Sequence, residues 1–425
     1  MASKPTITEV ENAFFPAREI RDPNRFAGRK TYVEEAYYAL LSEGTNIAVI
    51  GNRGIGKSSL ARQLMNIAAG KNELLDKLSI ATDKPLDFLP IYLACGKETS
   101  SHTELLEKLL TIKECLLDWS YDIPRALRSL EKYQPKFNVG IAALGGEKAT
   151  ESTFESTQPQ HDVETVFTNV VAAIAEEKLA KNGILIVVDE FDQIKDKSGF
   201  ASFLKSLATN VPQVKFCIVG VAHDMQELIK EHGSADRLFA GGIINLPPMA
   251  SEELAMIIRD AERSINRVIE FDNNATEKLV KLSQGHPYMV HLIGKYAFRH
   301  AFKTGCKDIS NDDIETTLKS IAESGTDPIL ENRYKKAVAS SGQREVVLKC
   351  LAEVQAGNLE IHTADAYKKS IDQGVDNPSQ FVGHLVTDDF GAEITKIRER
   401  YYRFSDSLFM AYVLARPPIV DQTVR

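Results

Sequence analysis

Four short apolar runs alternate with helical segments in the first 245 residues. They lie at 46–50, 87–93, 183–188 and 214–222, and the run at 183–188 contains no polar position. An unbroken apolar run of this length is typical of a strand that is buried on both faces of a parallel sheet. Because the segments between the runs show helical periodicity, the pattern predicts an α/β fold with helical crossovers on both faces of the sheet.

The pattern changes at the tripeptide L-P-P of residues 246–248, which breaks the chain before a series of helices. Ser251 opens the first of them with the capping-type sequence S-E-E-L, and helical periodicity continues to about Gly325. These helices predict a lid at 246–326 that closes over a ligand held by the sheet.

The last segment, 327–425, predicts a winged helix. Helical periodicity is found at 343–356 and 363–373, and an N-P-S sequence caps a third helix at 377–387. Residues 394–404 then read as two short strands around a charged turn. Three helices followed by a β-wing make this fold.

Two segments are predicted to lie outside these folded parts. Residues 1–25 are rich in proline and aromatic positions, which indicates an extended arm that packs on the core. The stretch 136–146 alternates small and apolar residues like an edge strand or hairpin arm, and 147–162 is rich in Ser, Thr, Glu and Gln. The latter is expected to be a mobile loop, either a plain linker or a segment that orders on a partner or DNA.

The predicted division of the chain follows from these boundaries. It comprises an N-terminal arm at 1–25, a nucleotide-binding α/β domain at 26–245, a helical lid at 246–326 and a winged-helix domain at 327–425.

The most informative motif follows the first apolar run, where Gly51 to Ser58 spell G-x-x-x-x-G-K-S. A strand precedes it and a helix follows it, which is the context that a phosphate-binding loop requires. Its glycines let backbone N–H groups face a phosphate, and the helix N-terminus adds partial positive charge. Lys57 is expected to reach the β- and γ-phosphates, and the Ser58 hydroxyl to bind Mg²⁺. The residues expected to contact nucleotide here are Gly51, Arg53, Gly54, Ile55, Gly56, Lys57, Ser58 and Ser59.

An acidic pair ends the apolar run at 183–188, where the sequence continues as Asp189-Glu190. Carboxylates at the carboxyl end of such a strand lie beside phosphates bound by the sheet. We therefore expect Asp189 to hold Mg²⁺ and Glu190 to act as the general base on the attacking water. A solvated acidic turn is the plainer alternative.

Two further polar residues are candidates for the catalytic machinery. His223 follows the run at 214–222 and could sense the γ-phosphate, although a lone histidine is more often structural. Arg237 lies after the next helix, where it could project into the nucleotide site of a neighbouring subunit and stabilise charge during phosphoryl transfer. The alternative is that Arg237 is an ordinary surface arginine.

With these residues in place, the chain resembles an AAA+ P-loop ATPase of the branch that origin-recognition-like initiators share with the STAND signalling ATPases. Phe26 and Arg29 in F-A-G-R resemble the F-x-G-R signature that begins the module and wraps the adenine. The phosphate loop and the acidic pair match its two nucleotide motifs, His223 falls at sensor 1, and Arg237 falls where initiators carry an arginine finger. Pro287, in G-H-P, resembles the G-x-P motif of the lid.

The chain departs from this family in two positions. The lid lacks the arginine called sensor 2, because the sequence there reads His286-Pro287-Tyr288, and sensor 1 is a histidine rather than the more familiar asparagine or threonine. The missing sensor 2 arginine favours a switch over a processive ring motor.

Composition excludes several other classes of protein. The chain has 425 residues, of which 43% are hydrophobic and 26% charged, and its net charge is −8, which argues against coating nucleic acid by charge alone. The five cysteines form no C-x-x-C pair, so neither a disulfide framework nor a zinc site is expected. No apolar stretch is long enough to cross a bilayer and no signal core is found, so a cytoplasmic location is expected.

The leading interpretation is a slow ATPase that works as an AAA+ or STAND-type switch, using ATP, ADP and Mg²⁺ to control assembly or partner signalling. It is expected to form a homo-oligomer or to bind a protein partner, without a membrane. A guanine-nucleotide switch is disfavoured because no N-K-x-D or T-K-x-D motif follows Asp189. A scaffold that binds ATP without turnover is a further alternative.

The alternative function is an ATP-dependent DNA-binding regulator of the initiator or transposition type that acts through the winged helix. Its third helix offers Ser379, Gln380 and His384 but no Lys or Arg. DNA contact would then rely on basic residues of the wing, namely Lys396, Arg398, Arg400 and Arg403. A purely protein-contacting winged helix is the competing interpretation.

Overall fold

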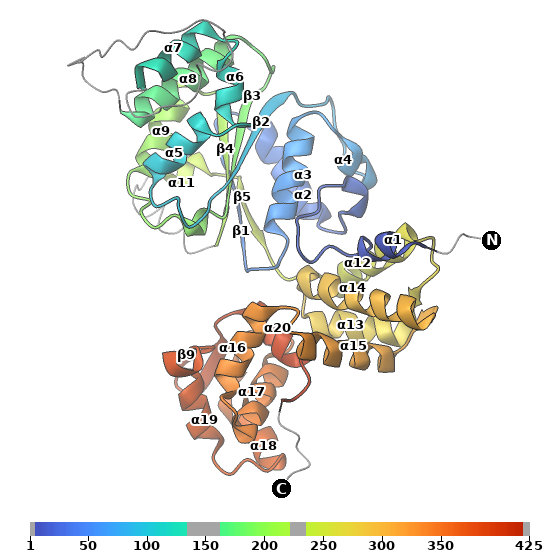
Figure 1. The fold of residues 1–425 in the computed structure, drawn as a ribbon. Coiled ribbons are helices and arrows are strands. Elements are labelled where there is room, and N and C mark those ends of the chain that lie inside the picture. Colours follow the sequence, from blue (N-terminus) through green and yellow to red (C-terminus); the bar gives the residue numbers. More distant parts are fainter. Residues whose placement is uncertain (1–4, 134–161, 222–234, 420–425) are drawn as a thin grey trace, which may run out of the picture. The chain divides into compact units, whose positions relative to one another are not determined.

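The computed structural model describes residues 5–133, 162–221 and 235–419 (Figure 1). The edge strand or hairpin arm predicted at 136–146, and nearly all of the loop predicted at 147–162, lie outside these residues. The chain divides into two compact units, each treated separately below. The sheet unit comprises Lys30–Gly51 and Leu60–Asn245, and the lid unit comprises Met1–Arg29, Asn52–Ser59 and Leu246–Arg425.

The sheet unit is built on five strands in the order β2-β3-β4-β1-β5. The strands are β1 (Ile47–Gly51), β2 (Phe88–Ala94), β3 (Gly183–Asp189), β4 (Val214–Gly220) and β5 (Ile243–Leu246). Strands β2, β3, β4 and β1 pair in parallel, and every residue of β3 and β4 is buried. The structure therefore confirms the predicted α/β fold with a parallel sheet.

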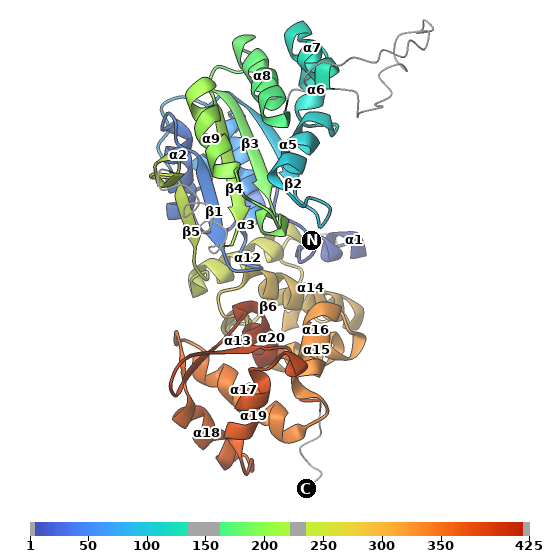
Figure 2. The same ribbon diagram turned by 90° about the vertical axis from the view of Figure 1, so that its left-hand side faces the viewer.

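Helices cover both faces of this sheet, as the pattern predicted (Figures 1 and 2). One face carries α2 (Lys30–Leu41) and α3 (Lys57–Ala68), and the other carries α5 (His102–Thr111), α8 (Val163–Glu176) and α9 (Phe200–Asn210). The other helices that the structure describes in this unit are α4 (Glu73–Lys77), α6 (Leu116–Ser120), α7 (Pro124–Tyr133), the short η3 (Phe191–Gln193) and α11 (Ala235–Leu238). The side chains of Ile184, Ile186 and Val188 face α5, α8 and α9, so alternate residues of β3 face α2 and α3.

The lid unit begins with the N-terminal arm, which contains α1 (Ile7–Glu11) and η1 (Pro23–Arg25). Glu11 accepts a hydrogen bond of 2.6 Å from Arg299, and the buried Phe14 ring lies 5.0 Å from that of Phe298. Both partners belong to the lid helix α14. The arm is thus partly helical, not simply extended, and within this unit it packs on the lid.

The lid itself consists of four helices and one short strand pair. They are α12 (Ser251–Ser264), α13 (Asn273–Ser283), α14 (Pro287–Thr304) and α15 (Asn311–Ser324), with β6 (Glu270–Phe271) and β7 (Asp308–Ile309). α15 is capped by Gly325, which has a left-handed conformation.

The C-terminal segment contains the predicted helices and hairpin, together with two helices that the sequence analysis missed. The predicted elements are α17 (Gly342–Gln355), α18 (Thr363–Asp372), α19 (Pro378–Leu385), β9 (Ile394–Arg398) and β10 (Tyr401–Phe404). The short strand β8 (Ile361–His362) completes a sheet of order β8-β10-β9, and η4 (Asp388–Phe390) precedes the hairpin. The missed helices are α16 (Pro328–Val338) and α20 (Ser407–Ala415). The winged-helix assignment stays a prediction.

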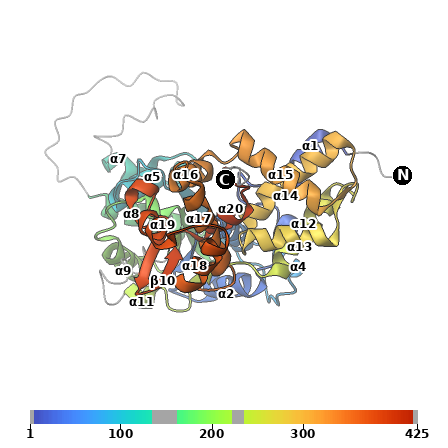
Figure 3. The ribbon, with the colours of Figure 1, turned by 90° about the horizontal axis from the view of Figure 1, so that it is seen from below.

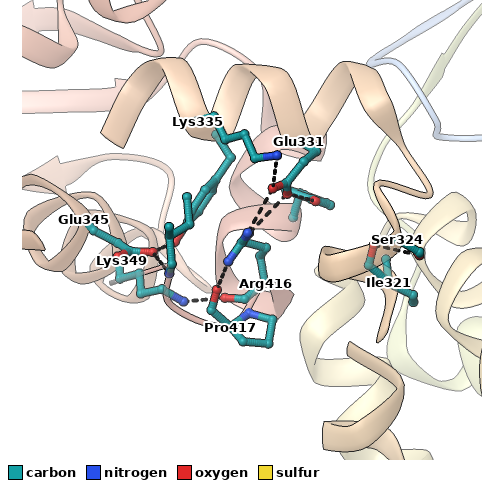
Figure 4. Close-up of polar contacts among 11 residues, drawn as sticks. Ile321, Ser324, Glu331, Lys335, Glu345, Lys349, Arg416 and Pro417 are labelled. Carbon is teal, nitrogen blue, oxygen red and sulfur yellow. Dashed lines mark hydrogen bonds and ion pairs between the residues drawn. The ribbon is translucent and has the colours of Figure 1, made fainter. Parts of the chain in front are cut away.

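A buried ion pair fixes the carboxyl end of α20 (Figure 4). Arg416 donates to Glu331 on α16 at 2.9 Å, and their side chains are only 9% and 3% exposed. Burial opposes ionisation of Glu331, but hydrogen bonds from Arg416 and Tyr412 outweigh it and lower its pKa. Because α20 also contacts α13 and α14, the ion pair holds this helix between α16 and the lid (Figure 3).

No helix within the described ranges has both the length and the apolar character needed to span a bilayer.

Candidate functional site

The predicted phosphate-binding loop joins β1 to α3 and has the backbone that its glycines allow. Gly54 and Gly56 have φ angles of +72° and +101°, a region in which side chains are strained. The Lys57 ammonium lies 3.0 Å from the carbonyl oxygen of Asn52, so it reaches back across the loop. The loop therefore provides a glycine-formed cradle, a cation and a helix N-terminus, a donor set that fits an anionic phosphate chain.

Arg29, the last residue of the F-A-G-R sequence, supports this loop directly. Its buried guanidinium donates to the carbonyl oxygen of Ile55 at 3.2 Å, and its backbone N–H donates to the Glu253 carboxylate at 2.5 Å. Gly28 has a φ angle of +62°, and a Cβ there would lie 2.6 Å from the Glu253 carboxylate. The motif thus links the loop to lid helix α12, and Phe26 beside it is buried.

The predicted lid motif Gly285-His286-Pro287 lies against the other side of the loop. Gly285 has a φ angle of +80°, and a Cβ there would lie 2.4 Å from Pro248. The Tyr288 N–H donates to the carbonyl oxygen of Gly54 at 3.5 Å, and Pro287 lies 3.9 Å from where a Cβ on Gly56 would stand. The structure therefore brings Pro287 and the phosphate loop together.

His286 is fully buried in this turn. Burial lowers its pKa to about 4, and the opposing influence of Asp406 and of the Arg53 backbone is smaller. The imidazole is therefore neutral at pH 7. It therefore brings no charge to this turn.

The amino end of α20 also contacts the phosphate loop. The Asn52 amide donates to the Ser407 hydroxyl at 3.0 Å, and a Cβ on Gly54 would lie 3.1 Å from the Leu408 side chain and 3.3 Å from that of Tyr288. Beside this contact is a cavity of about 390 Å³, lined by Arg53, Gly54, Tyr288, the start of α16, Arg333, Asp406 and Leu408. The lid and the C-terminal segment therefore meet at the loop.

The side chains around this cavity are held by ion pairs and hydrogen bonds. Arg333 pairs with Asp406 at 2.7 Å and with Glu393 at 2.6 Å. The Tyr288 hydroxyl donates to Asp327 at 2.6 Å, and burial together with this bond raises the pKa of Tyr288. These contacts connect the start of α16 to Tyr288 of the lid and to the start of α20.

The acidic pair lies in the sheet unit, at the carboxyl end of β3. Because β1 and β3 both run parallel to β4, Gly51 and Asp189 end their strands at the same edge of the sheet. The buried Asp189 carboxylate accepts a hydrogen bond from the Glu190 N–H at 2.8 Å and one from the Tyr92 hydroxyl at 2.8 Å. Glu190 is exposed and has a φ angle of +55°, an uncommon conformation for a residue with a side chain.

These side chains suit Mg²⁺ chemically, since hydroxyl and carboxylate oxygens are its preferred protein ligands. Ser58 is the second residue of α3 and provides a hydroxyl oxygen, and Asp189 is the last residue of β3 and provides carboxylate oxygens. The described ranges contain no group of three or more His, Cys, Asp or Glu side chains that could hold a metal ion by themselves.

Two of the predicted catalytic residues remain, Arg237 and His223. Arg237 is exposed on α11 in the sheet unit, and His223 lies outside the described residues. The sequence analysis missed Tyr92, Ser407, Leu408 and Glu253. Tyr92 could have been found from its place one residue before the end of the strand predicted at 87–93. No local signal marks the other three, because their contacts join segments more than 200 residues apart.

Comparison with known proteins supports this description. The family model described as Novel STAND NTPase 1 matches residues 16–297, a range that contains the phosphate loop, the acidic pair and the lid motif. A search of curated proteins found no match.

Several solved structures resemble the chain over most of its length. A Walker-type ATPase of Pyrococcus abyssi is 15% identical, with 94% of this chain and 98% of that chain covered, at a TM-score of 0.49. The ORC2 protein of Aeropyrum pernix in ADPNP-ADP complexes is 14% identical, with 96% of each chain covered and a TM-score of 0.47. Cdc6p of Pyrobaculum aerophilum is 12% identical, with 95% of this chain and 96% of that chain covered, at 0.45.

Proposed function

Because the chain belongs to the Novel STAND NTPase 1 family, we propose that it is an ATP-binding molecular switch that hydrolyses ATP slowly. The observation that carries this proposal is the contact of Ser407 and Leu408 with the phosphate loop. A triphosphate in the loop must alter the surroundings of Asn52 and Gly54. The loop's occupancy and the position of α20 are therefore coupled, and the C-terminal segment can report the nucleotide state to a partner.

The chemistry is assigned to the residues of the two nucleotide motifs. The loop N–H groups and Lys57 would hold the phosphates, Ser58 and Asp189 would hold Mg²⁺, and the metal would neutralise phosphate charge. Glu190 would accept a proton from the attacking water. Its left-handed backbone supports this role, because strained residues cluster at functional sites. Arg237 would act in the nucleotide site of a neighbouring subunit, and Phe26 and Arg29 would contact the adenine of the nucleotide.

Paired variants test the assignment of binding and catalysis. Lys57→Ala should abolish ATP binding by calorimetry, with Lys84→Ala, an exposed lysine of the sheet unit, as its control. Glu190→Gln should bind ATP but reduce phosphate release at least about a hundredfold, since a positioned base contributes about 10²- to 10⁴-fold. Glu177→Gln, an exposed glutamate at the end of α8, is its control. Unchanged turnover in Glu190→Gln would remove the base assignment.

A second experiment tests the switch itself. Leu408→Ala should loosen the contact with Gly54 and raise the affinity for ATP relative to that for ADP. Leu414→Ala, near the other end of α20, is the matched control. If the ratio of ATP affinity to ADP affinity were the same in the parent and in both variants, the C-terminal segment would not be coupled to the nucleotide site. Native mass with and without ATP and Mg²⁺ then tests assembly, and Arg237→Ala should block an ATP-dependent oligomer.

Binding of DNA is the alternative function, and the exposed hairpin β9–β10 supports it. Lys396, Arg400 and Arg403 are exposed, whereas the guanidinium of Arg398 pairs with Glu360 at 2.7 Å and lies 3.8 Å from the Tyr401 ring centroid. Filter binding to duplex DNA with ATP at two salt concentrations tests it, because phosphate contacts weaken as salt rises. Loss of binding in Lys396→Ala/Arg400→Ala/Arg403→Ala would support contact through the wing. No binding by the unaltered protein at either salt concentration would reject the alternative.

A further inference from the structure

Tyr92 stands beside the acidic pair for a reason that follows from the sheet register. β2 pairs in parallel with β3, with Tyr92 opposite Val187 and Ala94 opposite Asp189. Residues two apart on a strand point to the same face, so Tyr92 and Asp189 share one face of the sheet. The Tyr92 hydroxyl spans the remaining distance along the strand and donates to the Asp189 Oδ2 at 2.8 Å.

This bond completes the anchoring of the Asp189 carboxylate. The other oxygen, Oδ1, accepts the Glu190 N–H at 2.8 Å, so each carboxylate oxygen has one donor. The carboxylate cannot rotate about its Cβ–Cγ bond without breaking one of these bonds. Each oxygen keeps lone-pair capacity for a further donor, such as a water bound to a cation.

The Tyr92 ring is itself held by a residue of the helix that follows the phosphate loop. The guanidinium carbon of Arg62, on α3, lies 3.3 Å from the centroid of the Tyr92 ring. A cation over the ring face is attracted by the ring quadrupole and withdraws electron density, which makes the phenol a better donor to a carboxylate. Arg62, Tyr92 and Asp189 thus form a contiguous chain from α3 across β2 to β3.

We propose that Tyr92 is a positioning residue that fixes the Asp189 carboxylate for a hydrated divalent cation bound with nucleotide. The inference rests on the proposed nucleotide function and adds a residue to it. Groups that orient a metal-binding carboxylate typically change metal affinity by about 10- to 100-fold when they are removed. Tyr92 acts through Asp189 and does not need to touch the nucleotide.

Calorimetry of ATP binding with Mg²⁺ and with EDTA tests the proposal on the full chain. Tyr92→Phe removes only the hydroxyl, and we expect it to weaken ATP binding about tenfold with Mg²⁺ while binding in EDTA changes less than about twofold. Mn²⁺ binding to the protein–ATP complex, followed by electron paramagnetic resonance, should show the same loss. Tyr38→Phe is the matched control, because it also deletes a tyrosine-to-carboxylate bond, the one of 3.0 Å from the exposed Tyr38 to Glu34 on α2.

A double-mutant cycle separates positioning from general damage. In an Asp189→Asn background, Tyr92→Phe should cause no further loss of Mg²⁺-dependent affinity, since its effect passes through the carboxylate. Equal losses with Mg²⁺ and with EDTA, additive losses in the cycle, or a Tyr92→Phe protein that matches the parent would each overturn the proposal. If the parent protein binds no ATP under any condition, it is the proposed function that fails.

Discussion

The two units of the chain are stabilised in different ways. In the sheet unit, the described core is a continuous set of aliphatic and aromatic side chains around β3 and β4. Among the described acidic and basic residues of this unit, the buried ones are Asp189 and Lys215. In the lid unit, buried acids, arginines and histidines are spread from the arm to α20, with Arg29, His286, Glu331, Arg344 and Glu393 among them.

This difference predicts that the sheet unit is the more rigid of the two and that the lid unit is the easier to rearrange. Apolar burial is non-directional and independent of pH, so the sheet can keep the strand ends in place under many conditions. Buried ion pairs and hydrogen bonds are directional and stabilise only with all partners present. The proposed switch would require such discrete arrangements in the lid unit.

Removal of Arg416 is expected to have the largest effect. Arg416→Met leaves the Glu331 carboxylate buried without its main partner, which should destabilise the lid unit by about 3 to 5 kcal/mol. Hydrogen exchange should show faster opening of α16 and α20, with β3 and β4 unchanged. Arg259→Met is the control, because its partner Glu252 is 71% exposed, and it should cost less than about 1 kcal/mol. Equal losses in both variants would contradict a buried-pair mechanism.

Acid should destabilise the lid unit before the sheet unit. Burial lowers the pKa of His286 to about 4 and that of His291 to about 3. Above pH 6.5 the two histidines are neutral in both the folded and the unfolded chain, and their contribution to stability is fully present. Below pH 6.5 they become protonated in the unfolded chain but stay neutral in the folded chain, so stability is lost.

Each histidine therefore removes up to about 1.4 kcal/mol per pH unit as the pH falls from 6.5 towards 4. Denaturation at pH 7.5 and 5 measures this loss. His291→Gln keeps a side-chain acceptor for the Phe15 N–H and should halve the pH dependence. A sheet unit that loses stability as steeply as the lid unit over this range would contradict the comparison.

Gly54→Ala should disturb the contact between the phosphate loop and α20. The φ angle of +72° strains any side chain, and the new Cβ would lie 3.1 Å from Leu408 and 3.3 Å from Tyr288. A cost of about 1 to 3 kcal/mol is expected. Gly44→Ala is a close control, because its φ angle is +70° and a Cβ there meets nothing within 4 Å. The difference in unfolding free energy between the two variants isolates the packing against α20.

The smallest effect is expected in the centre of the sheet. Ile186→Val on β3 deletes one fully buried methylene and should cost about 0.5 to 1.5 kcal/mol. The loss should be the same at pH 7.5 and pH 5, because no titrating group is involved. A pH-dependent loss would show that the platform is coupled to the histidines of the lid.

Local patterns were sufficient to predict much of this fold. The strands β1, β3 and β4, the glycine loop and the acidic pair were found because buried parallel strands leave unbroken apolar runs and the motif fixes its own backbone. The lid helices were found from capping and periodicity. In contrast, α20 was missed because its sequence is apolar on all sides and so has no amphipathic period.

The contacts that matter most to the candidate site could not be read from the sequence. Leu408 meets Gly54 across more than 350 residues, and Tyr92 meets Asp189 only because β2 and β3 are neighbours in a particular register. The contact of the Arg29 guanidinium with the carbonyl oxygen of Ile55 was likewise not predicted, and its expected place beside the adenine stays a prediction. Such contacts depend on tertiary arrangement, which residue spacing does not encode.

The left-handed backbone of Glu190 has a consequence for protein engineering. Glycine adopts this conformation without strain, so Glu190→Gly should relieve part of a local cost of about 1 to 2 kcal/mol while deleting the proposed base. Selection for thermal tolerance alone would then favour a more stable protein that lacks the proposed base. Position 190 is thus one where durability and turnover are opposed, and directed evolution of this scaffold should score both.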